Sequence, residues 1–347
     1  MMNRMIFKGV SKMVNLHEMF GKTIGVVYTF EGEDALGFTH YHVWQSDIIS
    51  KWLLAIQDLK CRPLILDVRT FVEKAICGTL PNLDYVLNLN CGGCELSPMA
   101  LIPSVCAFLH IPCIPCNASA ILTGENKFMS NQIAKATGLQ VPKTLNKNIT
   151  GGIFRPLNLG SSIGVKREFS SFQNGIYQEF IRGYDITTPI IYNPVSQRMD
   201  IMPTVLYIAE NDNVEWFLGE ECKNSRSGFI RQTIFDLSDK LKEKYLEITH
   251  NIAINTFCRI DARIKCSSSD ELKFLLKKPL QLEDVYFIEI NPMPTVWINN
   301  AFSHSFSEID KAKSFAAYLS ELKQIIPEIT LHNFLLSIAI LAFITTM

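Results

Sequence analysis

CRIDARIKC, the stretch Cys258–Cys266, decides the fold of this chain of 347 residues. Apolar and charged residues alternate along it, and this pattern predicts a β-strand with one buried face. Alternate side chains of a strand point to the same face, so Arg259 and Asp261 are expected on one side. An arginine there could stabilise a developing negative charge beside a carboxylate that binds a cation.

A second strand is predicted at VYFIEINPMP, Val285–Pro294, where Glu289 and Asn291 share a face. If the two strands are neighbours, Asp261, Glu289 and Asn291 bring hard oxygen ligands together. Few protein oxygens, with phosphate oxygens completing the octahedron, are typical of Mg²⁺ sites. The alternative is a pair of ordinary strands with a local salt bridge.

A glycine- and serine-rich stretch lies upstream, at FRPLNLGSSIGVKRE, Phe154–Glu168. Small residues let a backbone approach a ligand closely, and hydroxyl and amide groups donate hydrogen bonds to it. Arg155, Lys166 and Arg167 flank the run, which indicates an anionic ligand. The alternative is a surface loop between two strands. The small residues of the run are Gly160, Ser161, Ser162 and Gly164.

Strand-like and helix-like segments alternate in the first part of the chain. This alternation predicts a parallel sheet covered on both faces, with ligands at the carboxyl ends of its strands. Two loops occupy those ends: EGED (Glu31–Asp34) and NCGGCE (Asn90–Glu95). Strands are predicted at residues 22–30, 62–68, 84–90 and 112–116, and helices at 43–59, 98–111 and 126–137.

Composition limits the classes of function. The net charge is −1, so no broad basic field for nucleic acid exists. The N-terminal residues lack the pattern of a secretory signal, and ten cysteines are then expected as thiols in the cytoplasm. The apolar run Phe334–Ile344 is about half of the roughly 20 residues that span a bilayer. A buried closing helix is therefore predicted, with a membrane anchor as the alternative.

Two C-x-x-C pairs have the spacing of a four-cysteine zinc site. They are Cys91 with Cys94, and Cys113 with Cys116. The second pair lies where an apolar strand is predicted, and cysteine is among the residues most often buried. Packing in the core is therefore the favoured interpretation, and zinc is the alternative.

The order of these elements resembles that of ATP-grasp enzymes, in particular the D-alanine–D-alanine ligases. GSSIGV, RID and EIN carry the resemblance, together with the segment around GENKFMSNQIAKATGLQVPKTL. The resemblance implies a combined α/β and α+β fold. Its N-terminal α/β domain with a parallel sheet would span residues 1–118, a small central α+β domain 119–185, and a C-terminal α+β domain 186–347.

The resemblance also implies a role for each matching residue. Lys127, Arg155 and Lys223 would contact phosphates, as would the loop residues Gly160, Ser161, Ser162 and Gly164. Gln178, Glu179, Phe180 and Ile181 match a hinge that binds adenine, and Asp185 matches a ribose-binding acid. Asp261, Glu289 and Asn291 match ligands of Mg²⁺ (or Mn²⁺). Arg259 and Ser161 are the candidate catalytic residues.

The sequence departs from these ligases at three places. Arg155 stands where they have lysine, and arginine is a planar fork rather than a point charge. The central domain is short. In the substrate region, Thr295 and its neighbours replace Gly-Met-Thr, and Asn90 replaces a histidine. Glu31 or Glu33 could bind a substrate ammonium, although a solvated acidic turn is equally compatible. We therefore do not favour two D-alanines as substrates.

The sequence thus predicts an ATP-dependent carboxylate–amine ligase that acts on amino acids or small carboxylic acids. The expected cofactors are ATP and Mg²⁺ (or Mn²⁺). No nucleic acid or membrane partner is expected, and a homodimer is left open. The alternative is a nucleotide-binding pseudoenzyme that acts as a regulatory or scaffold subunit.

Overall fold

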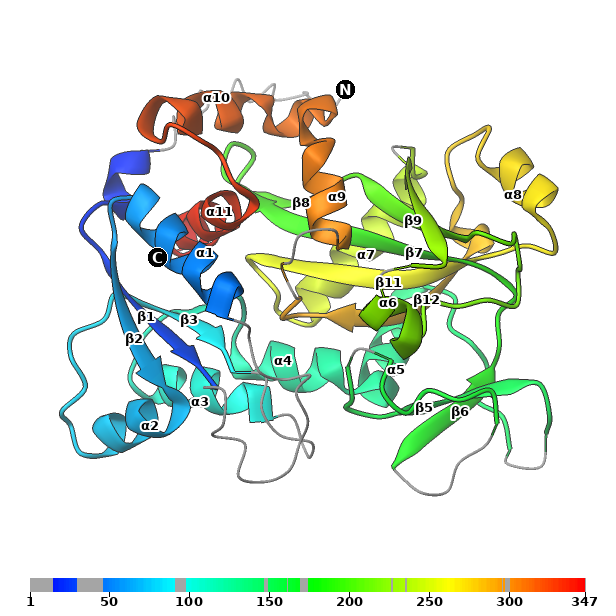
Figure 1. The fold of residues 1–347 in the computed structure, drawn as a ribbon, viewed down its shortest axis with the longest axis horizontal. Coiled ribbons are helices and arrows are strands. Elements are labelled where there is room, and N and C mark those ends of the chain that lie inside the picture. Colours follow the sequence, from blue (N-terminus) through cyan, green and yellow to red (C-terminus); the bar gives the residue numbers. More distant parts are fainter. Residues whose placement is uncertain are drawn as a thin grey trace, which may run out of the picture.

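In the computed structural model, the chain forms three β-sheets, and helices pack on and between them (Figure 1). The described residues are 15–29, 46–90, 98–146, 149–160, 162–168, 174–225, 227–234, 236–294, 296 and 300–346. The candidate residues Glu31, Glu33, Ser161 and Thr295 lie outside them, as do Cys91 and Cys94.

The first sheet is parallel, with strand order β2-β1-β3-β4. Alternate residues of β1 face opposite sides: Ile24 and Val26 pack toward α1, and Val27 packs toward α2 and α3. Both faces are therefore covered, as predicted. The elements are β1 (Thr23–Tyr28), α1 (Ser46–Asp58), β2 (Arg62–Asp67), α2 (Val68–Ile76), β3 (Tyr85–Leu89), α3 (Leu101–Phe108) and β4 (Cys113–Ile114).

The second sheet is antiparallel and has the order β10-β9-β7-β11-β12, with β8 paired to β7. Its apolar face packs on α7, α4 and α5, which explains the alternating pattern of β11. In Figure 1, α6 and α9 lie in front of the sheet and α7 lies behind it. The strands are β7 (Gly183–Asn193), β8 (Arg198–Ile201), β9 (Thr204–Ala209), β10 (Phe229–Ile234), β11 (Phe257–Lys265) and β12 (Val285–Asn291).

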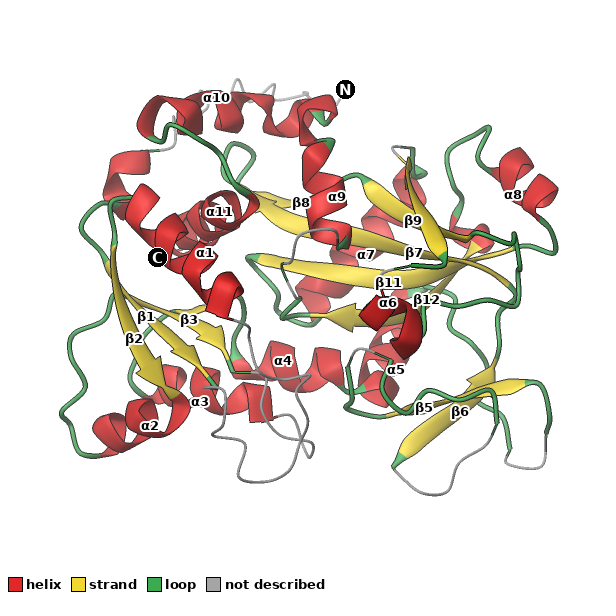
Figure 2. Cartoon of the chain, viewed as in Figure 1, coloured by secondary structure: helices red, strands yellow, loops and turns green. Residues whose placement is uncertain are grey.

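A small antiparallel ribbon of β5 (Gly152–Pro156) and β6 (Gly175–Glu179) forms the third sheet (Figure 2). Two helices precede it, α4 (Ala118–Glu125) and α5 (Lys127–Thr137). Asn126 caps the start of α5 through the backbone N–H of Met129, and Gly138 ends it at a φ of 94°. The helix therefore begins one residue later than the sequence predicts and ends where it predicts, at Thr137. Among the described residues from 139 to 182, only strands, turns and isolated bridges occur, in agreement with the shortened central domain.

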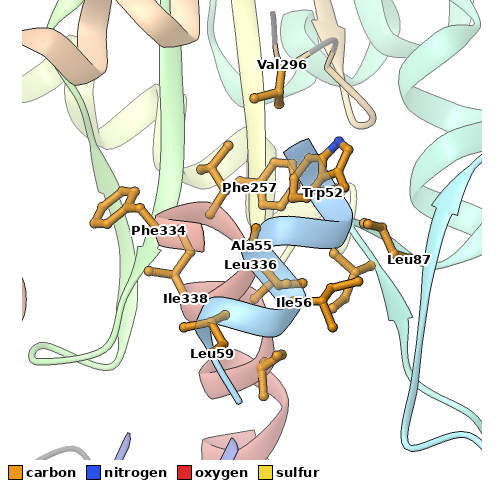
Figure 3. Packing of buried hydrophobic residues seen from close by; sticks show 14 of the residues in the cluster. Trp52, Ala55, Ile56, Leu59, Leu87, Phe257, Val296, Phe334, Leu336 and Ile338 are labelled. Carbon is orange, nitrogen blue, oxygen red and sulfur yellow. The ribbon is translucent and has the colours of Figure 1, made fainter. Parts of the chain in front are cut away.

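The closing helix α11 (Leu331–Thr346) is part of the main hydrophobic core. Elements α1, β7 and α9 pack around α11, so a helix that is apolar on all sides is buried there. Figure 3 shows Phe334, Leu336 and Ile338 of α11 against Trp52 and Ile56 of α1. The prediction of a buried helix is confirmed.

The remaining helices are α6 (Glu220–Ser225), α7 (Asp239–Asn251), α8 (Ser269–Leu275), α9 (Ala301–Ser307) and α10 (Ala316–Ile325). In the described part of the chain, none of the helices has the length and apolar character that crossing a bilayer requires.

Candidate functional site

A surface pocket lies where four separate segments meet. The end of α4, the start of α5, the loop after β5 and the end of β12 all contribute to it. Gly124 allows this close approach, because a Cβ there would lie 2.9 Å from Pro292. The pocket is lined by Gly124, Glu125, Lys127, Asn158, Leu159, Gly160, Glu289, Ile290 and Asn291. Four residues that the sequence singled out are among them: Lys127, Gly160, Glu289 and Asn291.

The start of α5 holds the loop after β5 in place. The backbone N–H of Lys127 donates to the Leu157 carbonyl at 3.0 Å, and Asn126 Nδ2 donates to Asn158 Oδ1 at 3.1 Å. The ammonium of Lys127 donates to the Leu159 carbonyl at 2.6 Å. Burial lowers the pKa of Lys127, and the charge of Glu289 opposes that effect. A buried lysine thus faces the pocket beside a carboxylate.

The two motif strands are neighbours, as predicted. In the β11–β12 register, Asp261 lies opposite Glu289, and Arg259 lies opposite Asn291. Asp261 accepts a hydrogen bond from Thr187 Oγ1 at 2.6 Å and another from Arg259 Nε at 3.1 Å. The three candidate metal ligands therefore share one face of adjacent strands. Two carboxylates and one amide oxygen suit Mg²⁺, which takes few protein ligands.

Glu289 is the electrostatic centre of the pocket. Its Oε2 lies 2.7 Å from Arg155 Nη2 and 3.7 Å from Lys127 Nζ. Burial alone would raise the pKa of Glu289, but the charges of Lys127, Arg155 and Lys223 outweigh it and lower the pKa to about 2. Glu289 is therefore ionised across the physiological pH range.

The low pKa of Glu289 predicts a pH-dependent contribution to stability. A carboxyl whose pKa falls from 4.5 to about 2 on folding stabilises the protein above pH 4.5, and this contribution is lost as pH falls toward 2. We expect the free energy of unfolding at pH 7 to be higher for wild type than for Glu289→Gln, and this difference should become smaller between pH 4.5 and 2. Urea unfolding of both proteins across this pH range measures the difference. A difference that does not change with pH would contradict the ion pair.

Arg155 connects the small ribbon to the second sheet. Its Nη1 donates to the Ile288 carbonyl at 3.0 Å and lies 3.4 Å from Gln178 Oε1, while Nη2 binds Glu289. One lysine ammonium could not reach these three acceptors in the same planar geometry. Arginine rather than lysine at position 155 therefore allows all three contacts to form.

The glycine- and serine-rich loop forms a tight turn against α6. Ser162 and Gly164 have φ values of 63° and 69°, and the Ile163 N–H donates to the Gly160 carbonyl at 3.0 Å. Ser162 Oγ donates to the Leu218 carbonyl at 3.0 Å and accepts from Lys223 Nζ at 2.8 Å. Burial lowers the pKa of Lys223, and the charge of Glu289 opposes that effect. The predicted loop and the predicted Lys223 are thus in direct contact.

The predicted hinge is held by side chains on both sides. Gln178 is buried, and its Nε2 donates to Asn131 Oδ1 at 3.0 Å and to the Pro142 carbonyl at 3.1 Å. Glu179 Oε1 accepts from the Lys143 N–H at 2.9 Å. The side chain of Gln178 is therefore committed to the protein, so a nucleotide base would meet the hinge through its backbone.

Phe180 lies between two guanidinium groups, with Arg167 at 3.6 Å and Arg263 at 4.9 Å from its ring centroid. Asp185 has both carboxylate oxygens engaged. Its Oδ1 accepts from Arg263 Nη1 and its Oδ2 accepts from the Leu218 N–H, each at 2.7 Å. Any ribose hydroxyl would share Asp185 with these donors.

Comparison with known proteins adds to this geometry. No protein-family model matches the sequence. A D-alanine–D-alanine ligase of Fervidobacterium nodosum is 26% identical over 181 residues, which cover 45% of this chain. The matched residues cover 50% of the length of that relative.

Solved structures resemble the chain over most of its length. A D-alanine–D-alanine ligase of Bacillus anthracis, complexed with ATP, superposes with a TM-score of 0.59 and 14% identity, covering 94% of this chain and 98% of that one. The chain has the fold of the D-alanine–D-alanine ligases. The VanG D-Ala:D-Ser ligase of Enterococcus faecalis gives a TM-score of 0.55 at 12% identity, covering 88% of this chain and 99% of that one.

The D-alanine–D-alanine ligase fold confirms the expected fold class. In this chain, the carboxyl end of the parallel sheet lies close to the residues that follow β12. Asn88 Nδ2, near the end of β3, is 3.5 Å from Met293 Sδ. Asn90 is buried at the same end and accepts from Thr29 Oγ1 at 2.9 Å. Asn90, the predicted substrate residue, thus lies at the carboxyl end of the parallel sheet.

Two of the four cysteines of the zinc alternative, Cys91 and Cys94, lie outside the described residues, which themselves contain no group of three or more histidine, cysteine, aspartate and glutamate side chains placed to hold a metal. Cys113 and Cys116 are buried, and Cys116 Sγ donates to the Pro292 carbonyl at 3.1 Å. Burial raises the pKa of both thiols. These two cysteines are core residues of the ligase fold.

Sequence reasoning missed several polar residues of the site. Asn131 lies one helical turn after Lys127 on α5, and its Nδ2 donates to the Ile288 carbonyl at 3.0 Å. Arg263 lies two residues after Asp261, so the alternation that paired Arg259 with Asp261 also places Arg263 on that face. Thr187 and Tyr207 come from β7 and β9, and no local pattern marks them.

Proposed function

We propose that this protein is an ATP-dependent carboxylate–amine ligase that joins amino acids or small carboxylic acids through an acyl phosphate. One observation carries the proposal: Lys127 of α5, Gly160 of the loop after β5, and Glu289 and Asn291 of β12 line a single pocket. The fold that the chain shares with the D-alanine–D-alanine ligases supports it, and one of those structures holds ATP.

ATP would bind between the loop after β5 and the end of β12. Lys127, Arg155 and Lys223 supply positive charge for its phosphates, and the backbone N–H groups of Ser162 and Gly164 in the tight turn supply hydrogen bonds. Asp261, Glu289 and Asn291 would hold Mg²⁺ or Mn²⁺. The bound metal would neutralise phosphate charge and orient the phosphate oxygens.

The chemistry has two steps. A substrate carboxylate attacks the γ-phosphate of ATP, which forms an acyl phosphate and releases ADP. An amine then attacks the acyl carbon, the C–O bond to phosphate breaks, and the amine loses a proton as phosphate leaves. Lys127 and Lys223 position the transferring group, and Arg259 stabilises the oxyanion of the tetrahedral intermediate. No covalent protein nucleophile is needed.

Arg259 gives a direct test of this mechanism. Its Nε is fixed by Asp261, while its terminal amino groups have no protein partner among the described residues. We expect Arg259→Gln to lower kcat about 10²- to 10³-fold, the usual cost of losing an oxyanion donor. The exposed Arg62→Gln on β2 serves as control. Steady-state kinetics with the best substrate pair measures the change, and a wild-type kcat would refute the role.

The central experiment is a screen for phosphate release. L- and D-amino acids are incubated in pairs with ATP and Mg²⁺, and products are identified by mass. We expect one or more pairs to give a condensed product together with ADP and phosphate. ATP binding with no ADP release from a mixed amino-acid pool would favour the alternative, a nucleotide-binding pseudoenzyme.

We also propose the predicted three-part division, 1–118, 119–185 and 186–347. The parallel sheet falls in the first part and the ribbon in the second, and β7 begins at Gly183, close to the last boundary. We propose a cytoplasmic location, and a homodimer remains open to measurement by light scattering.

A further inference from the structure

A second cationic group lies on the same face of the large sheet as Arg259 and Asp261. Arg231 on β10 is opposite Tyr207 on β9 in the strand register. Its guanidinium carbon lies 4.8 Å from the ring centroid of Phe229 and 5.8 Å from that of Tyr207. Arg231 is therefore held over two aromatic rings while it remains partly exposed.

Arg231 has no anionic partner in the part of the chain that the structure describes. No carboxylate there lies within ion-pair distance of it, and its Nε is buried without a hydrogen-bond acceptor. A guanidinium fixed over aromatic rings with unused donors is well suited to bind a carboxylate.

The neighbours of Arg231 on the same face of the sheet are the ring of Tyr207 and a polar pair that joins β10 to α9. Thr233 Oγ1 and His304 Nε2 are 3.1 Å apart, which ties β10 to α9, and Ala301 of α9 packs on Tyr207. Burial raises the pKa of Tyr207, and the charges of Arg259 and Arg231 both act against this. Tyr207 thus lies between two arginines whose terminal amino groups are unused.

The order of the strands places Arg231 near one of the two substrates. The pocket with Glu289 and Asn291 is at β12, Arg259 is on β11, and Arg231 is three strands further, on β10. At about 4.8 Å per strand, β10 lies roughly 14 Å from β11. The acyl phosphate would have its phosphate at the β12 side, so the amine must approach the acyl carbon from the β10 side.

We propose that Arg231 binds a side-chain carboxylate of the amine substrate, so that the acceptor is a dicarboxylic amino acid. This inference rests on the proposed ligase function, because it names the substrate class of that site. It makes Arg231 a specificity-determining residue.

The test compares acceptors that differ only in side-chain charge: glutamate with glutamine and aspartate with asparagine, as both enantiomers. The donor is the one that gives the fastest phosphate release. The quantity measured is the ratio of kcat/KM for the acidic acceptor to that for its amide. Wild type is compared with Arg231→Gln and with Arg198→Gln, a control at an exposed arginine on β8.

We expect the acidic acceptor to be preferred by wild type and equally by Arg198→Gln. The ratio should fall about 10- to 100-fold in Arg231→Gln, the usual value of a hydrogen bond between charged groups. An unchanged ratio in Arg231→Gln, or a wild-type preference for the amide, would overturn the inference. If Arg231→Gln does not fold, Arg231→Lys replaces it, with a smaller fall expected because the charge remains and the planar fork is lost.

A binding measurement separates this inference from the proposed function. Glutamate and glutamine are titrated calorimetrically into each protein in the presence of a non-hydrolysable ATP analogue and Mg²⁺. If no pair is turned over but glutamate binds more tightly than glutamine only when Arg231 is present, the subsite stands and the ligase proposal fails. Equal binding of both amino acids to wild type refutes the subsite, whatever the turnover.

Discussion

Glu289→Gln is expected to lower turnover at least about a thousandfold, more than the loss of a single oxyanion donor. Glutamine keeps the shape of the side chain but removes the charge that would bind Mg²⁺ beside Asp261. It also leaves Lys127 and Arg155 without their shared counter-ion, at 3.7 and 2.7 Å. We therefore expect a lower Tm together with a native-like circular dichroism spectrum, because the amide oxygen can still accept from Arg155.

The matched control is Glu243→Gln, at an exposed position on α7 away from the pocket. Phosphate release should be normal in that variant. Turnover by Glu289→Gln within about tenfold of wild type, at saturating ATP and Mg²⁺, would refute the metal assignment. If both variants lose activity, their circular dichroism spectra decide whether misfolding is the cause.

Arg263→Met is expected to destabilise the protein by about 3–5 kcal/mol, the usual cost of removing one partner from a buried ion pair. Arg263 is buried, and its guanidinium donates to the carbonyls of Ile181, Gly183 and Trp216 and to Asp185. Methionine can fill much of the space but satisfies none of these acceptors. The hinge and the segment that leads to Lys223 would both lose their anchor.

Chemical denaturation measures this cost, with the exposed Arg198→Met as control. A double-mutant cycle with Asp185→Asn should show strong coupling, because removing Asp185 first leaves Arg263 with less to lose. A stability change below about 1 kcal/mol would show that water replaces the guanidinium donors.

Local patterns predicted the strands and the helix that carry the candidate site residues. The alternation in CRIDARIKC and VYFIEINPMP identified both strands, their shared face and the side of the sheet that carries Asp261 and Glu289. Helix α5 was predicted from its amphipathic pattern and from Gly138 at its end, both of which are local properties of the chain. These predictions succeed because they depend on neighbours within a few residues.

Contacts between distant segments could not be predicted in this way. Arg155 was singled out as a phosphate contact, and the fold joins it to Glu289, 134 positions away along the chain. The engagement of Asp185 by Arg263 and the Leu218 N–H depends on three segments meeting. No pattern within one segment encodes such a meeting, because it arises only when the sheets and helices pack.

The sequence alone determined the chemistry available: two carboxylates and an amide on two strands, several cations, and a turn of small residues. Those properties follow from side-chain type and backbone period, which are local. Only the tertiary structure decided which charges face one another, that Glu289 is shared by Arg155 and Lys127, and that Arg231 is left without a counter-ion among the described residues. Electrostatic energy depends on distance through space, and that distance is fixed by packing between segments remote in the chain.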